Sequence, residues 1–265
     1  MATAARHAVA GHYRFRHVAH MEWIKLRSLR STWWTLAITV GGAIAMAAVV
    51  GASTRNRAGD LTNNVLAGVV PGLLLTGVLG VVVMTGEYTS GMIRATLAAV
   101  PGRPLVLAAK AAVFGVVALA AGEAASFISF LAGGAALRHG IAAPSLAQPA
   151  VLRAVVLAGA SFSLIGLLGL GLGAVIRHTP AAIAVLAGGV YLAAQFAGFV
   201  ARGAAGYMPV LIIGNSLSTT KPENCPAHAA PCPHFLSAWA GLGMLCLYAA
   251  VALGAGAWLL GRRDA

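Results

Sequence analysis

The chain has 265 residues, of which 59% are hydrophobic and only 9% are charged, and its formal net charge is +12. Soluble domains contain roughly 25% charged residues, so too little polar surface remains here to coat a water-soluble globule. This composition excludes secreted disulfide scaffolds, collagen-like repeats and disordered tails. It predicts an all-α polytopic membrane protein, because several uncharged stretches can cross a hydrocarbon layer about 30 Å thick.

The 18 basic residues are scattered between hydrophobic blocks and form no single stripe on a soluble face. We therefore expect no nucleic-acid partner and interpret them as determinants of membrane topology.

Residues 1–32 predict a cytoplasmic leader, because they carry several basic residues and no long apolar run. Within it, residues 21–34 have the mixed apolar and basic composition of a helix lying in the plane of the lipid headgroups. Leu26 and Leu29 share one face at helical spacing, although Glu22 falls on the same face. A polar connector is the alternative interpretation.

Six apolar stretches predict membrane-spanning helices in a transmembrane domain over residues 33–260. Their approximate bounds are 33–52, 61–85, 105–136, 151–176, 181–200 and 237–260. The third stretch should begin outside the hydrocarbon, because Lys110 must snorkel to the interface. Residues 201–236 form a long outer loop, and residues 261–265 form a tail.

Basic residues are about twice as numerous on the side of the membrane that holds both chain ends, which predicts cytoplasmic termini. Small residues recur at four-residue spacing, Gly68 with Gly72 and Gly169 with Gly173. This spacing lets helix backbones approach closely and favours packing within the chain over a subunit interface.

The sequence lacks the motifs of an ATPase or hydrolase. No lysine stands in a Gly-Lys-Ser/Thr context, which excludes a P-loop, and no HExxH or GxSxG motif occurs. The chain is therefore not predicted to be an enzyme by itself, and energy for uphill transport must come from elsewhere.

The polar stretch after the second span predicts a short helix between Gly91 and Pro101. Ile93, Leu97 and Val100 form one apolar edge of this helix, with Arg94 beside it. A helix this short cannot bury such an edge alone. It should insert either into its own bundle or into a soluble partner.

Three segments carry a resemblance to a known family: Glu22–Trp34, Gly86–Pro101 with Lys110, and the closing Arg262–Ala265. Together they resemble the ABC-2 type transporter permeases of actinobacteria, and the similarity extends over nearly the whole chain. The block over residues 86–110 is its most specific part.

The resemblance implies a permease subunit of an ATP-driven exporter in the bacterial cytoplasmic membrane. Residues 20–32 would be the connecting elbow helix, and residues 91–100 the coupling helix that docks on an ATP-binding subunit. The docking residues would be Glu87, Gly91, Ile93, Arg94, Leu97 and Val100.

Two permeases, expected to be identical, would pair around a cavity formed mainly by the second and fifth spans. They would sit on two separate ATP-binding subunits that hold ATP and Mg, so this chain binds no cofactor or metal. The cargo would be an amphipathic small molecule or peptide, such as an antibiotic.

Glu123 interrupts the uncharged third span near its middle. A carboxylate at that depth costs about 2.5 to 3.5 kcal/mol and usually faces a cavity or a partner. Two interpretations stay open: a residue on the substrate path, or a structural hydrogen bond to Ser126, Ser161 or the backbone of another span.

Gln195, Phe196 and Phe199 lie in the outer half of the fifth predicted span. Aromatic residues there usually serve as packing or interface anchors. Because the resemblance places this span beside the cavity, they are also candidates for contact with an apolar cargo.

The long outer loop contains an apolar stretch, Tyr207 to Leu217, that predicts a helix dipping into the membrane or forming a lid. Cys225 and Cys232 follow, and outside the cytoplasm their spacing favours a disulfide. A metal site with His228 and His234, or free thiols, remain alternatives. Cys246 is expected to be a small core residue.

Two other classes of function compete with the exporter. One is a membrane scaffold or immunity protein that binds a toxin or lipid without pumping. The other is a proton-coupled secondary carrier that uses Glu123 and needs no ATPase.

Overall fold

A computed structural model describes residues 14–55, 60–100, 102–138, 141–193, 206–219 and 236–262. Within these ranges every regular element is helical. Among the described residues, five helices are long and apolar enough to cross a membrane: α2 (Arg30–Ser53), α4 (Val69–Thr89), α6 (Arg103–Ala136), α7 (Pro149–Ile176) and α11 (Ala238–Arg262). The prediction of an all-α, multi-pass membrane protein is confirmed.

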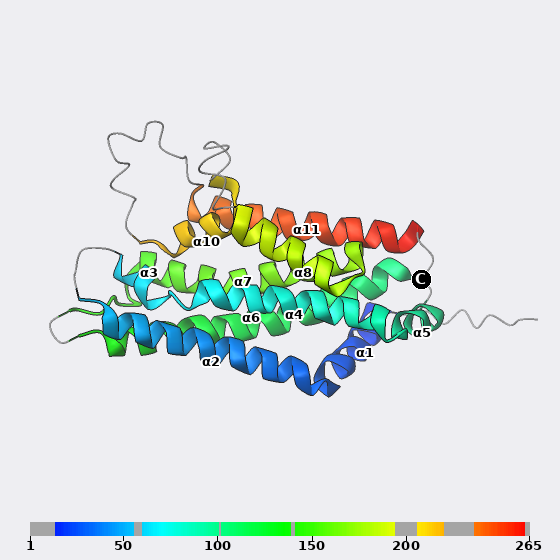
Figure 1. Cartoon of the computed structure of the whole chain (residues 1–265), viewed down its shortest axis with the longest axis horizontal. Helices are drawn as coiled ribbons and strands as arrows, with labels where there is room; N and C mark the ends of the chain where they lie inside the picture. Colours follow the sequence, from blue (N-terminus) through cyan, green and yellow to red (C-terminus); the bar gives the residue numbers. More distant parts are fainter. Residues whose placement is uncertain are drawn as a thin grey trace, which may run out of the picture.

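Helix α6 is longer than a bilayer crossing requires. Its 34 residues extend over about 51 Å at 1.5 Å per residue, against a hydrocarbon layer of about 30 Å. Several turns of α6 therefore lie outside the hydrocarbon. The start of α6 lies at the end of the bundle that also holds α1 (Phe15–Ser28), α5 (Met92–Ala99) and the end of α11 (Figure 1).

The second predicted stretch is divided in the structure. A short helix, α3 (Leu61–Val65), precedes α4, and residues 66–68 form a turn between them. Gly68 lies so close to α2 that a Cβ atom there would overlap the backbone carbonyl of Ala43. The backbone of Gly68 thus contacts α2 at the point where the helix predicted over residues 61–85 is interrupted.

The fifth predicted span is described only in its first half. It comprises α8 (Thr179–Ala187) and a π-helical turn, η1 (Gly188–Leu192). Gln195, Phe196 and Phe199 lie outside the described residues, as do Cys225 and Cys232. Their predicted roles stay predictions.

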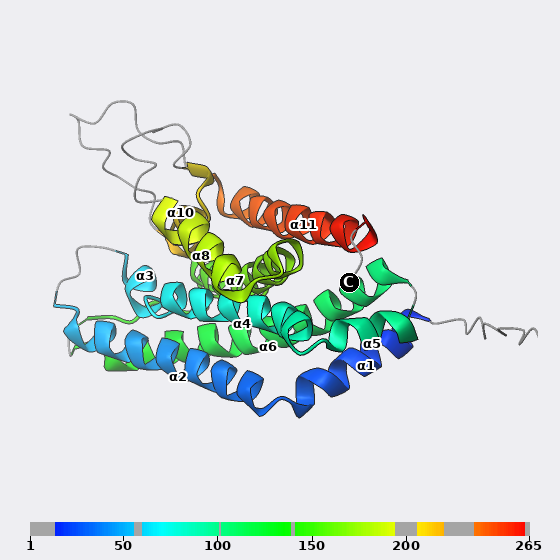
Figure 2. The ribbon, with the colours of Figure 1, turned by 45° about the vertical axis from the view of Figure 1, so that its right-hand side comes forward.

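Helix α7 is the central element of the bundle. It packs against α4, α6 and α11, and 67% of its apolar window is buried, against 22% for α11. Figure 2 shows α11 along the outside of the group and α2 on the opposite side of α4 and α6. Cys246 is exposed on α11, so the expectation of a core position for this cysteine is wrong.

Glycines permit the contact between α4 and α7. A Cβ atom added at Gly80 would overlap the carbonyl oxygen of Gly166, and one added at Gly169 would overlap that of Gly77. The two backbones therefore touch directly, as small residues at four-residue spacing allow. For Gly169, this is the packing within the chain that its spacing predicted.

At the end of the bundle opposite α1, a short apolar helix, α10 (Pro209–Leu217), packs against α7 and α11 (Figure 1). Asp60 caps α3 by accepting hydrogen bonds from Thr62 and Asn63. The hydroxyl of Thr219 also donates to Asp60 over 2.9 Å, which joins the end of α10 to the start of α3. The apolar stretch predicted from Tyr207 to Leu217 is thus helical from Pro209.

The contact between α4 and α7 can be tested with two alanine substitutions on the same helix. Gly80→Ala should destabilise the protein by about 1 to 3 kcal/mol, because the methyl group has no space. Gly86→Ala is the matched control, since a Cβ atom there meets nothing within 4 Å. Thermal unfolding in detergent measures both variants. Equal unfolding midpoints for the two would contradict direct backbone packing.

Candidate functional site

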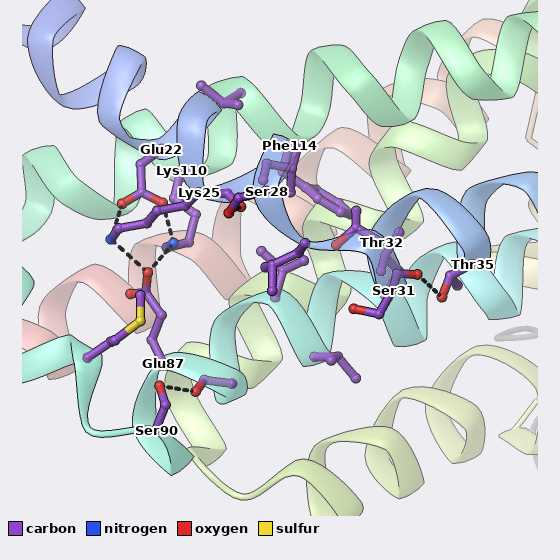
Figure 3. Close-up of a pocket in the computed structure, with 18 of the residues that line it drawn as sticks. Glu22, Lys25, Ser28, Ser31, Thr32, Thr35, Glu87, Ser90, Lys110 and Phe114 are labelled. Atoms are coloured by element: carbon purple, nitrogen blue, oxygen red, sulfur yellow. Dashed lines mark hydrogen bonds and ion pairs between the residues drawn. The ribbon is translucent and has the colours of Figure 1, made fainter.

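Four charged side chains from three helices form a buried ion-pair cluster where α1, α4 and α6 meet (Figure 3). The Lys25 ammonium lies 2.9 Å from Oε1 of Glu22 and 2.9 Å from Oε1 of Glu87. The Lys110 ammonium lies 2.9 Å from the same Glu87 oxygen and is also paired with Oε2 of Glu22. We refer to Glu22, Lys25, Glu87 and Lys110 as the ion cluster.

The ion cluster is electroneutral and almost completely buried. Glu22, Glu87 and Lys110 are only 3%, 6% and 4% exposed. Charged groups in such surroundings are retained only when they are paired and hydrogen-bonded, because desolvation costs several kcal/mol for each ion. Two carboxylates and two ammonium groups satisfy this requirement together. None of them would be stable there alone.

The sequence of α1 places Glu22 in the cluster. Val18, Glu22 and Leu26 are the buried residues of this helix, and a spacing of four residues puts them on one face. Glu22 is therefore the polar member of an otherwise apolar face. Its position there reflects pairing with two lysines and explains the imperfect amphipathic pattern of the segment.

Helix α1 differs in its bounds from the helix expected over residues 21–34. It begins at Phe15 and ends at Ser28, and the backbone bends at Leu29 before α2 begins. Trp33 and Trp34 belong to α2. In Figure 2, α1 and α2 meet at an angle.

Lys25 connects the cluster to α5, because its ammonium group also donates a 3.0 Å hydrogen bond to the Thr96 hydroxyl. Burial alone would lower the pKa of Lys25, but hydrogen bonds to Glu22 and Glu87 raise this pKa above its ordinary value of 10.5. The stabilisation by this pairing is therefore fully present below pH 10.5. It is lost as the pH rises through the raised pKa of the folded state.

Lys110, predicted to snorkel to the interface, has a buried ammonium group whose partners are Glu22 and Glu87. Glu87, expected among the residues that dock a partner, is likewise inside the cluster. The available signals for this pairing were a lysine within an apolar helix, a glutamate on the apolar face of α1 and a glutamate near the end of α4. The sequence alone did not show which of these charges meet.

The short helix α5 forms where it was predicted, after Gly91. Gly91 has a left-handed backbone with φ of +71°, a conformation that glycine adopts without steric cost. This turn separates α5 from α4 and directs one face of α5 toward α1 and α6.

The apolar edge of α5 inserts into the chain itself. Ile93 belongs to a buried cluster with Leu26 and Leu107, and Val100 to another with Val18 and Val106. Of the two surfaces predicted for this edge, Ile93 and Val100 insert into the chain's own bundle, and Leu97 is partly buried. The predicted docking of α5 on an ATP-binding subunit stays a prediction. The exposed residues of α5 are Met92, Arg94, Ala95, Ala98 and Ala99.

A pocket of about 420 Å³ lies beside the ion cluster, between α1, α2, α4 and α6. Glu22, Lys25, Glu87 and Lys110 line its charged part, with hydroxyl groups of α1 and α2 nearby (Figure 3). Its apolar walls include Leu79, Val82, Val83, Val113 and Phe114. The pocket is thus polar at the cluster and apolar elsewhere.

Glu123 is separate from this site. Its carboxyl lies against Gly159 on α7, and none of the hydrogen bonds or ion pairs among the described residues involves it. The hydroxyls of Ser126 and Ser161 donate to the carbonyls of Val155 and Leu157 instead. The structural hydrogen bond expected from these serines to Glu123 is therefore not formed.

No protein-family model and no curated protein matches this sequence. The family resemblance rests on the motifs of the sequence, and the geometry of the ion cluster stands independently of it.

The ion cluster can be tested by removing one charge and then two. Lys110→Met should destabilise the protein by about 3 to 5 kcal/mol, because it leaves Glu22 and Glu87 underpaired in a buried site. The double variant Glu22→Gln with Lys110→Met should lose less than the sum of the single variants, with a coupling of about 1 kcal/mol or more. Unfolding in detergent measures all variants. Arg94→Met, at an exposed position, is the control and should stay within about 0.5 kcal/mol of the unmodified protein. Additive effects of the two cluster substitutions would contradict the pairing.

Proposed function

We propose that this chain is the permease subunit of an ATP-driven exporter of the ABC-2 type. In this proposal a separate ATP-binding subunit drives an amphipathic small molecule or peptide out across the cytoplasmic membrane. The observation that carries the proposal is the attachment of α5. One face of this short helix is exposed at the end of the bundle, and the opposite face is joined to three other helices.

The connection of α5 to the bundle supports a role in transmitting force. Thr96 accepts a hydrogen bond from Lys25, and Ile93 and Val100 are buried against α1 and α6. A force on the exposed face would therefore reach α1, α4 and α6 together, since packed side chains and ion pairs resist compression. The direct backbone contact of α4 with α7 extends this path into the bundle.

The distribution of charge supports a cytoplasmic position for α5. Lys25, Arg27, Arg94, Arg103 and Arg177 all lie on segments at the end of the bundle that holds α1 and α5 (Figure 1). An excess of basic residues marks the cytoplasmic side of membrane proteins. The two ATP-binding subunits and a second copy of the permease complete the proposed complex.

The contact with an ATP-binding subunit can be tested at the exposed face of α5. A photo-crosslinking amino acid at Ala98 should capture a polypeptide with a P-loop in native cells. Arg94→Glu with Ala98→Glu should reduce recovery of that polypeptide about tenfold, because an unpaired charge would be buried at the interface. Arg16→Glu, an exposed charge reversal on α1, is the control. Full recovery of the ATPase with the α5 variant would refute docking at this helix.

Proton-coupled transport is a second candidate, supported by the position of Glu123. This carboxyl lies in the middle of α6 without an ionic partner among the described residues, and such groups often belong to ion pathways. Glu123→Gln should fold normally but reduce transport. Collapse of the proton gradient at constant ATP distinguishes the two mechanisms: it stops a secondary carrier and leaves an ATP-driven exporter active.

A further inference from the structure

The pocket beside the ion cluster has one unused hydrogen-bond acceptor and one unused hydrogen-bond donor. Oε1 of Glu87 accepts from two lysines, whereas Oε2 is buried and has no hydrogen-bond partner in the described part of the chain. Lys110 uses two of its three ammonium hydrogens, toward Glu22 and Glu87. The pocket wall therefore holds one unpaired carboxylate oxygen, which is buried and is reached only when a neighbouring side chain moves, and one ammonium group with an unused hydrogen.

Two hydroxyl groups extend the donor side of the pocket. Ser31 and Thr32 both line it, and neither hydroxyl takes part in the hydrogen bonds found among the described residues. The hydroxyls of Ser28 and Thr35 are already used, because they donate to the carbonyls of Lys25 and Ser31. Ser31 and Thr32 therefore add to the donors available for a ligand.

An unpaired buried carboxylate oxygen lacks the free energy of a hydrogen bond to a charged group. A ligand with N–H groups would recover it. Because the four protein charges already balance, a purely anionic or purely cationic ligand would leave net charge in the pocket. The complementary head therefore carries a donor-bearing cation and an anion together.

The rest of the pocket fits a hydrocarbon chain. Leu79, Val83 and Phe114 form apolar walls, and Val82 is 43% exposed on the side of α4. The volume of about 420 Å³ lies in the usual range of about 300 to 1,000 Å³ for small-molecule sites. A soluble zwitterion would leave these walls uncovered.

We propose that this pocket binds the head and upper chain of a membrane phospholipid with a primary ammonium group, of the phosphatidylethanolamine type. The lipid ammonium donates to Oε2 of Glu87, and its phosphate accepts from Lys110. Met92 lines the same wall, and its flexible side chain can move to admit the head. This inference does not depend on the proposed ATPase partner.

Such a lipid would stabilise the junction of α1 with α2, because it would contact both helices. The pocket is lined by both helices on either side of the bend at Leu29, as well as by α4 and α6. Its occupant contacts the ion cluster and the apolar wall at once. The position of α1 against the bundle would then respond to the lipid composition of the cytoplasmic leaflet.

The test is a methylation series of lipids added to the delipidated, full-length protein in detergent. The lipids are phosphatidylethanolamine, its N-methyl and N,N-dimethyl derivatives, and phosphatidylcholine, all with the same acyl chains. Native mass spectrometry measures the affinity of each. Binding should weaken stepwise to about tenfold for phosphatidylcholine, because its quaternary ammonium has no N–H donor. Equal affinities across the series would overturn the proposal.

Two further ligands identify the source of the zwitterionic head. Soluble phosphoethanolamine should bind much more weakly than the lipid, since it leaves the apolar walls uncovered. Equal binding of this soluble head would overturn the lipid as occupant. Phosphatidylglycerol, which is anionic, should also bind more weakly, and tighter binding of this lipid would overturn the zwitterionic match.

Val82→Trp locates the site without disturbing the ion cluster. The larger side chain should fill the mouth of the pocket and abolish the preference for the primary ammonium lipid. Val116→Trp is the matched control, because Val116 is exposed on α6 and does not line the pocket. It should retain the preference. An unchanged preference in Val82→Trp would overturn this location, and the methylation series on the unmodified protein decides the proposal if that variant fails to fold.

Discussion

The desolvation of four charges is the constraint on which this end of the molecule depends. Glu22 and Lys25 on α1 meet Glu87 on α4 and Lys110 on α6 in a site where three of the four side chains are almost completely buried. No single helix could carry its own charge into that site, because each buried ion needs the others. The cluster therefore holds together helices that are distant in the chain, and it places α1 against the bundle where a simple hydrophobic contact would allow sliding.

Two sets of packing contacts surround the ion cluster, one to α5 and one between α4 and α7. Thr96, Ile93 and Val100 join α5 to α1 and α6, and glycine contacts bring the backbones of α4 and α7 together. The same charges form the polar wall of an amphipathic pocket. One group of residues thus contributes both to the attachment of the proposed docking helix and to the proposed lipid site. Because the same residues serve both, the proposal links the lipid composition of the membrane to the position of α1.

The sequence predicted the elements more successfully than the contacts. The spans at residues 33–52, 105–136, 151–176 and 237–260 correspond to α2, α6, α7 and α11, since uncharged runs of that length form helices in lipid. The short helix after Gly91 was also predicted. The sequence did not show which surface this helix contacts, because Ile93 and Val100 would fit a groove on this chain as well as one on another protein. The helix predicted over residues 21–34 lies instead at Phe15–Ser28, because the backbone bends at Leu29 and α2 begins at Arg30.

The amino-acid sequence by itself determined that the chain is a multi-pass helical membrane protein, because composition and run length are properties of single segments. Only the tertiary structure decided which charges are paired, which edge of α5 is buried, and where an amphipathic pocket opens. These features depend on atoms from residues such as Glu22 and Lys110, which are 88 positions apart. Local periodicity carries no information about such pairs, whereas the cost of burying an uncompensated charge selects them once the helices pack.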